Sequence, residues 1–179
     1  YTYTFKSWTP EVKTVTGDAT YQATYTKEAN SYTLTYNLDG GKWENDTTYT
    51  YPKKYNEEVE VKADPTKEGY TFADWTSEDV AIENDAFTMP AKDVTLKAKW
   101  NVNKYTIKWV NWDGSEVRTD TEVPYGTELE VPEDPTREAD AQYTYTFKSW
   151  TPEVKMVTGD AVYTAVYDLS LIHISEPTR

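Results

Sequence analysis

The chain has 179 residues, a formal net charge of −13, 16 Tyr, 7 Trp and no Cys. This negative charge repels phosphate backbones and anionic lipid headgroups, which argues against nucleic acid and membrane surfaces as partners. The lack of Cys excludes disulfides, thiolate metal sites and Cys nucleophiles. The sequence contains no run of the roughly 20 apolar residues that a transmembrane helix needs, so no membrane insertion is expected. No signal peptide begins the chain, and Tyr1 is not expected to be a natural start.

Residues 1–26 have a near copy at residues 143–168. The copies differ at five positions, namely Thr14/Met156, Thr20/Val162, Gln22/Thr164, Thr24/Val166 and Thr26/Asp168. The last four differences fall on alternate residues, and alternate side chains of a strand point to opposite faces. We therefore expect Tyr21, Ala23 and Tyr25 to share the buried face of a strand, with the variable positions in solvent.

The polar segment 27–31 is expected to be a linker, followed by a complete repeat over residues 32–100. Leu34, Tyr36 and Leu38 alternate with polar residues, which predicts a strand with one buried face. Asp39-Gly40-Gly41 predicts a tight hairpin turn. Alternation in the last strand of this repeat places Leu96, Ala98 and Trp100 inward. A short helix within 50–60 or 76–87 is left open.

A second linker is expected at 101–104 and a second complete repeat at 105–168. Its opening strand, its turn at Asp113-Gly114, its loop at Asp134-Pro135 and its closing strand follow the order found in 32–100. An insertion at 139–143 leaves one loop without a predicted geometry. Residues 1–26 then correspond to the C-terminal half of a truncated repeat. The predicted fold class is mainly β, built of tandem small β-rich units with little helix, in which neighbouring repeats contact one another.

The last segment, LSLIHISEPTR, belongs to no repeat. It resembles the reading-frame translation of a sequencing-library adapter. We therefore expect residues 169–179 to be a non-native tail. His173, the only His of the chain, then carries no functional information.

Without Cys, and with His173 set aside, the chain lacks the residues for a catalytic triad, an ordinary zinc site or an imidazole base. We expect no enzymatic activity, no catalytic residues, no cofactor and no metal. Acidic and amide residues in predicted loops do not follow the spacing of a calcium-binding loop, so solvated loop charge is the preferred interpretation for Glu44, Asn45, Asp46, Asp79, Asn84 and Asp85.

Five of the Trp residues fall into two groups. Trp8, Trp75 and Trp150 each follow a Phe by three residues at one place in the repeat, which is typical of a repeated core anchor. Trp43 and Trp112 have no counterpart and flank predicted hairpin turns. They are the candidate ligand-facing aromatics, because exposed rings can stack on sugars.

The segments YTLTYNLDGG, PTKEGYTFADW and MPAKDVTLKAKW, with a Thr-Phe-x-x-Trp motif before a closing strand, resemble the Listeria-Bacteroides repeat family, also called internalin B-type repeats. The resemblance covers residues 1–168. It implies β-grasp-like units in bacterial proteins that are secreted or attached to the cell surface or cell wall, and no shared catalytic residues.

These observations favour a non-catalytic structural or adhesive stalk of a bacterial surface or secreted protein. The alternative is a module that binds carbohydrate or host protein through exposed aromatics or a strand edge. Clustering of Trp43 and Trp112 with nearby Tyr residues on one open surface would favour the alternative.

Overall fold

The computed structural model describes residues 1–172, which contain twelve strands and no helix. In chain order the strands are β1 (Thr2–Thr9), β2 (Gln22–Glu28), β3 (Ser31–Asn37), β4 (Thr50–Lys54), β5 (Glu58–Glu60), β6 (Tyr70–Thr76), β7 (Ala86–Thr88), β8 (Val94–Val102), β9 (Lys104–Val110), β10 (Glu116–Pro124), β11 (Tyr143–Thr151) and β12 (Ala161–Leu171). The predicted mainly β fold is confirmed. The segments 50–60 and 76–87, where a short helix was left open, contain strands and turns instead.

The described residues form two compact units. One comprises Tyr1–Glu68 with Phe72–Trp100, and the other comprises Gly69–Thr71 with the chain from Asn101 onward. The units do not follow the repeats strictly, because the short segment at residues 69–71 makes its contacts with the second unit. Each unit is described separately below.

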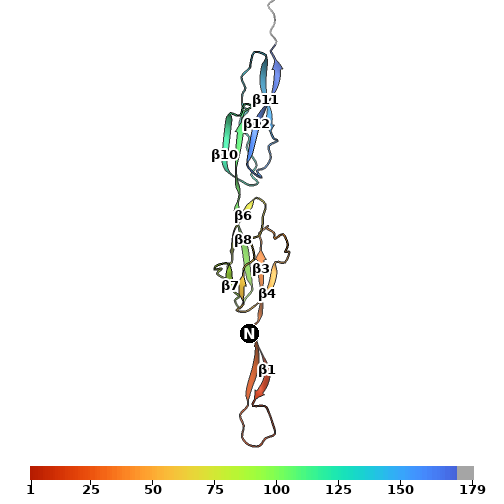
Figure 1. Ribbon diagram of the computed structural model, residues 1–179, viewed down its shortest axis with the longest axis vertical. Helices are drawn as coiled ribbons and strands as arrows, with labels where there is room; N and C mark the ends of the chain where they lie inside the picture. The colour runs from red at the N-terminus through yellow and green to blue at the C-terminus, as the bar shows by residue number, and fades with distance from the viewer. Residues whose placement is uncertain (173–179) are drawn as a thin grey trace, which may run out of the picture. The chain divides into compact units, whose positions relative to one another are not determined.

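The first unit has a four-stranded sheet in the order β4-β3-β8-β6 (Figure 1). The central strands β3 and β8 are parallel, with Leu34 opposite Val94 and Tyr36 opposite Leu96. β4 pairs with β3 in the antiparallel sense. First and last strands that lie parallel at the centre agree with the β-grasp-like fold implied by the family resemblance.

The predicted inward faces of β3 and β8 form the core of this unit. Leu34, Tyr36 and Leu38 are at most 5% exposed, and Leu96 and Ala98 are at most 2% exposed. A small sheet of β5 and β7 adds Val59 and Phe87 to the same buried cluster. Because β-branched, aromatic and other apolar side chains alternate with Thr, Lys and Asn, each strand buries one face and solvates the other.

The expected hairpin turn at Asp39-Gly40-Gly41 is only partly right. Asp39 and Gly40 take positive φ values of 48° and 85°, as a tight turn requires, whereas Gly41 does not. The chain does not return at once as a paired strand, since β4 begins only at Thr50. The intervening segment folds over the sheet and brings Trp43 against the core.

The second unit has a sheet in the order β10-β9-β12-β11, which repeats the arrangement of the first. β9 and β12 are the parallel central pair, and Ile107 and Trp109 of β9 are fully buried. Asp113-Gly114 lies in the turn between β9 and β10, where Gly114 has a φ of 85°. The segment 125–142, which includes all but the last residue of the insertion, contains no strand, so the small sheet of the first unit has no counterpart here.

Residues 1–28 form an antiparallel hairpin of β1 and β2, drawn in red in Figure 1. Its register and its bulge match those of β11 and β12, with Phe5 opposite Tyr25 as Phe147 is opposite Tyr167. The side chains differ in burial. Trp8 is 47% exposed, whereas its counterpart Trp150 is 9% exposed. The expectation of a core anchor is therefore right for Trp75 and Trp150 and wrong for Trp8.

The same contrast affects the predicted buried face of the closing strand. Tyr163 and Tyr167 of β12 are at most 8% exposed, while Tyr25 of β2 is 57% exposed. The physical reason is the neighbouring strand, because β12 pairs with β9 and β2 pairs only with β1 among the described residues.

β12 extends through Leu171, past the expected boundary of the repeat at Asp168. Leu169 and Leu171 pair with Tyr145 and Tyr143 but are 61% and 70% exposed, so their contribution is mainly backbone pairing. Whether 169–179 is foreign to the protein stays a prediction, and His173 lies outside the described residues.

Candidate functional site

Trp43, one of the two candidate ligand-facing aromatics, is packed into the first unit. Its Nε1 donates a hydrogen bond to the carbonyl of Ala63 at 2.8 Å. Its ring centroid lies 5.3 Å from that of Tyr36 and 6.0 Å from that of Tyr49. The ring is half-buried, and only a shallow hollow of about 310 Å³ opens beside it. The prediction that Trp43 lies exposed beside a turn is therefore wrong, because the segment after Asp39 folds it onto the core.

A charged network lies next to Trp43. The Lys62 ammonium contacts the Asp46 carboxylate and the Tyr51 hydroxyl, and it lies 4.9 Å from the centroid of the Trp43 ring. The Lys62 hydrogen bond, together with the Thr48 N–H and the Tyr51 hydroxyl, lowers the pKa of Asp46 to about 2. The Asp46 carboxylate is therefore already paired within the segment between β3 and β4 and with Lys62, and it is not a free carboxylate.

Trp112, the other candidate, lies in the second unit and is 50% exposed, as the sequence predicted. The guanidinium carbon of Arg137 lies 3.9 Å from the centroid of its ring and 3.5 Å from that of Tyr145. A cation placed over an aromatic face is attracted by the ring quadrupole. One face of Trp112 is thus already in contact with Arg137.

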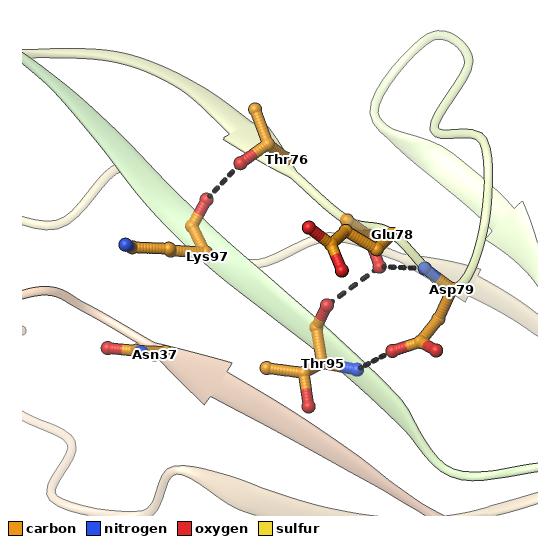
Figure 2. Close-up of a pocket in the computed structure, with 7 residues that line it drawn as sticks. Asn37, Thr76, Glu78, Asp79, Thr95 and Lys97 are labelled. Carbon is orange, nitrogen blue, oxygen red and sulfur yellow. Dashed lines mark hydrogen bonds between the residues drawn. The ribbon is translucent and has the colours of Figure 1, made fainter.

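A hollow of about 540 Å³ lies in the first unit beside β8 (Figure 2). The Asp79 carboxylate accepts a hydrogen bond from the Thr95 N–H at 3.0 Å and pairs with the Lys92 ammonium at 2.8 Å. The Lys92 and Thr95 hydrogen bonds lower the pKa of Asp79. The Ser77 hydroxyl donates to the Thr95 carbonyl at 2.7 Å, and the Thr76 hydroxyl donates to the Lys97 carbonyl at 3.1 Å. These polar groups fasten the chain after β6 to β8, and the hollow is open and polar.

No cluster of three or more His, Cys, Asp or Glu side chains suited to a metal ion occurs within residues 1–172. In the same part of the chain there is no helix that could span a membrane.

The linker residue Asn30, between β2 and β3, makes contacts on both sides. Its carbonyl accepts the Tyr55 N–H at 2.8 Å, and its Oδ1 accepts the Thr2 hydroxyl at 2.8 Å. The rings of Tyr55 and Tyr1 meet edge to face with centroids 5.3 Å apart. Asn30 is thereby bonded to β1 of the hairpin and to the turn after β4.

Asn103, between β8 and β9, has the same set of contacts within the second unit. Its carbonyl accepts the Tyr125 N–H at 2.8 Å, and its Oδ1 accepts the Thr71 hydroxyl at 2.6 Å. The rings of Tyr125 and Tyr70 lie 6.3 Å apart. A Cβ on Gly69 would approach the Tyr125 ring to 2.1 Å, so a side chain at position 69 would displace this ring.

The turns that carry Tyr55 and Tyr125 are themselves fixed. Asn56 and Gly126 follow these tyrosines with φ values of 67° and 78°. The Asn56 N–H donates to the Met89 carbonyl at 2.9 Å, and the Gly126 N–H donates to the Val157 carbonyl at 2.7 Å. Met89 and Val157 are both buried, so each linker asparagine is bonded to a turn that is anchored on a core.

A family model described as the Listeria-Bacteroides repeat domain matches residues 32–99 and again residues 105–168, well over half of the chain. The chain belongs to the Listeria-Bacteroides repeat family. The family resemblance drawn from the sequence is confirmed.

Several curated proteins share similarity with these Listeria-Bacteroides repeats. Internalin H of Listeria monocytogenes is 34% identical over 127 residues, which is 67% of this chain and 20% of that protein. A putative membrane protein of Evansella cellulosilytica is 28% identical over 173 residues, or 96% of this chain and 23% of that protein. The chain thus spans about a quarter or less of these relatives. Among solved structures, streptococcal high identity repeats in tandem, domains 3–4 of a cell surface protein, are 15% identical with a TM-score of 0.28, covering 79% of this chain and 99% of that one.

The sequence of the Listeria-Bacteroides repeats predicts Asn30 and Asn103 only as linker residues and assigns them no functional role. A signal was present, because each asparagine lies two residues before the first tyrosine of a repeat, Tyr32 or Tyr105. Alignment on these tyrosines would have brought the two asparagines together.

Proposed function

We propose that this chain is a non-catalytic stalk segment of a bacterial surface or secreted protein, in which small β units in series hold other domains away from the cell. Residues 1–26 are taken as the second half of a repeat, 27–31 and 101–104 as linkers, 32–100 and 105–168 as complete repeats, and 169–179 as a foreign tail. The observation that carries this proposal is the matched set of contacts around Asn30 and Asn103.

A stalk needs linkers that resist bending. A short linker without such bonds would let successive units swing independently, whereas a linker whose carbonyl and side chain are both hydrogen-bonded has fewer conformations. Each asparagine here also lies beside a tyrosine pair that adds apolar contact. The same set of contacts occurs at two successive linkers. This repetition favours a mechanical role for the contacts over chance packing of surface side chains.

The relatives support the proposed location. Internalin H and the putative membrane protein are several times longer than this chain, which is consistent with repeats that serve as part of a larger protein. The proposed place is the outside of a bacterial cell, attached to its surface or wall.

The proposal is tested by ¹⁵N relaxation, which reports the rotational correlation time of each repeat in the whole chain. Residues 32–100 and 105–168 should tumble together, and Asn103→Ala combined with Thr71→Val should separate their correlation times. Asn101→Ala is the matched control, because Asn101 is an exposed asparagine at the end of β8. Repeats that tumble independently in the unaltered chain would refute a stiff stalk.

The alternative, a carbohydrate- or host-protein-binding module, rests on Trp112. Half of this side chain is exposed, and the neighbouring Arg137 and Tyr145 offer polar atoms beside the ring. Trp43 adds nothing to such a surface, since it is packed into the first unit. Glycan-array binding that disappears in Trp112→Ala while the fold is kept would favour the alternative.

A further inference from the structure

The β1–β2 hairpin carries a solvent-exposed apolar face with a complete set of identical counterparts in the second unit. Phe5, Trp8 and Tyr25 are 49%, 47% and 57% exposed, and Val15 in the connecting loop is 85% exposed. Trp150, Val157 and Tyr167, the counterparts of Trp8, Val15 and Tyr25, are at most 9% exposed, and Phe147, the counterpart of Phe5, is half-buried. The same residues are therefore a core in one place and a surface in the other.

In the second unit this face is covered by the first half of the repeat, residues 104–142. Trp109 of β9 lies 5.1 Å from the ring of Trp150 and is stacked at 4.7 Å on Tyr163. The Tyr167 hydroxyl donates to Asn111 Oδ1 at 2.7 Å.

Backbone groups complete this cover. Asp160 Oδ1 accepts the Thr106 N–H at 2.8 Å. Val157 pairs with the turn after β10, accepting the Gly126 N–H at 2.7 Å and donating to the Thr127 carbonyl at 3.0 Å. The second half of the repeat, residues 143–168, is called here the closing half. Its side chains and its backbone both bind the first half.

The hairpin has an identical residue at every position of the closing half that makes these contacts. Trp8, Val15, Asp18, Tyr21 and Tyr25 correspond to Trp150, Val157, Asp160, Tyr163 and Tyr167. The five differences between the copies include none of them. The hairpin therefore has the surface with which residues 143–168 bind the first half of the repeat, but no such segment covers it among the described residues.

The open edge of β2 shows the effect of that missing neighbour. β12 begins at Ala161, where it pairs with Ile107 of β9, and the paired segment runs to Thr164. β2 begins only at Gln22, so residues 19–21, which correspond to 161–163, are not in a strand. These residues are strand in β12 because β9 is beside them.

We propose that the β1–β2 hairpin is an acceptor for the first half of a Listeria-Bacteroides repeat, a segment with the sequence of residues 104–142. The incoming strand adds in parallel to the edge of residues 19–22, as β9 does to β12, and its Trp109 fills the space over Trp8 and Tyr21. The occupant is a repeat segment and not a glycan, because the surface matches β9 in both hydrogen bonds and side-chain shape. This proposal relies on residues 1–26 being half a repeat and is independent of the stalk function.

The test adds a synthetic peptide of residues 104–142 to the whole chain and measures hydrogen exchange and, by calorimetry, the dissociation constant. Residues 15–28 should gain protection, with residues 19–21 protected for the first time, and residues 143–171 should be unchanged. Trp8→Ala should weaken binding by about tenfold or more, as loss of a central aromatic anchor does. Tyr25→Phe, which removes one hydroxyl and leaves the hairpin intact, should weaken it by a few-fold.

Matched controls separate recognition from nonspecific adhesion. Lys6→Ala alters the hairpin at a position that corresponds to exposed Lys148, and it should bind as the unaltered chain does. In the peptide, Trp109→Ala should abolish binding, whereas Lys108→Ala, which changes an exposed position of β9, should not. Three results would each overturn the proposal. Residues 19–21 could stay unprotected with millimolar peptide, or the protection could appear in residues 143–171 instead. The Trp8→Ala and Lys6→Ala chains could also bind the peptide with equal affinity.

Discussion

Three tryptophans at one position of the repeat differ in their surroundings, and this makes their replacement a quantitative test. Trp75 is 4% exposed, its ring lies 5.1 Å from Tyr36 and 5.3 Å from Phe72, and its Nε1 donates to the Lys62 carbonyl at 3.1 Å. Removing a buried Trp costs about 3 to 5 kcal/mol, and the lost hydrogen bond adds about 1 kcal/mol. Trp75→Ala should therefore lower the free energy of unfolding of the first unit by about 4 to 6 kcal/mol.

Trp150 is buried in the same way but lacks the polar contact. Its Nε1 has no hydrogen-bond partner among the described residues. An unsatisfied buried N–H costs about 1 to 3 kcal/mol, so its removal offsets part of the lost packing. Trp150→Ala should cost about 3 kcal/mol, and Trp8→Ala, at a half-exposed site, about 1 kcal/mol or less.

Trp→Phe substitutions isolate the polar part of this difference. Trp75→Phe loses a hydrogen bond, whereas Trp150→Phe removes an unpaired N–H, so Trp150→Phe should cost at least about 1 kcal/mol less. Denaturant titration followed by residue-resolved NMR keeps the two units apart, since one transition cannot be assumed for both. Equal costs for the two Phe variants, or a Trp8→Ala cost close to that of Trp75→Ala, would contradict the burial and hydrogen bonding described here.

Three further outcomes are expected. Because the pKa of Asp46 is lowered to about 2, its contribution to stability is present above about pH 4 and is lost as the pH falls toward 2. The melting temperatures of the parent and Asp46→Asn should thus converge between pH 4 and 2, and a gap that stays constant would argue against the Lys62 pair. In the chain without added peptide, amides of residues 1–28 should exchange faster than those of 143–170, since a hairpin without a third strand is marginal in water; equal protection would mean that the hairpin has a partner. Deletion of residues 169–179 should change the melting temperature little, because Leu169 and Leu171 are exposed, and a drop of more than about 5 °C would show that the tail packs.

The internal repeats made the strand faces predictable. Variation on alternate residues between the two copies identified the face that carries Tyr163 and Tyr167, and both side chains are buried. Periodicity likewise placed Leu34 and Leu96 inward. These predictions succeed because the two faces of a strand are set by local alternation, whatever strand lies beside it.

Burial that depends on distant segments was not predictable in the same way. Trp8 and Trp150 share one local sequence, and only the presence of β9 beside β12 separates their environments. Trp43 is covered because a long connection folds back on Tyr36, and no local signal encodes that path. The contacts of Asn30 and Asn103 join residues more than twenty positions apart, which a linker composition does not reveal.

The sheet edges carry features that bear on crowding. The edge strand β4 contains Pro52 followed by Lys53 and Lys54, and the edge strand β10 is interrupted between Asp120 and Val123. A proline withholds a backbone donor, a lysine must be desolvated before another strand can dock, and a bulge twists the edge away from a flat partner. The edges at β4 and β10 therefore resist pairing with strands of neighbouring copies, even where many chains stand close together at high local concentration.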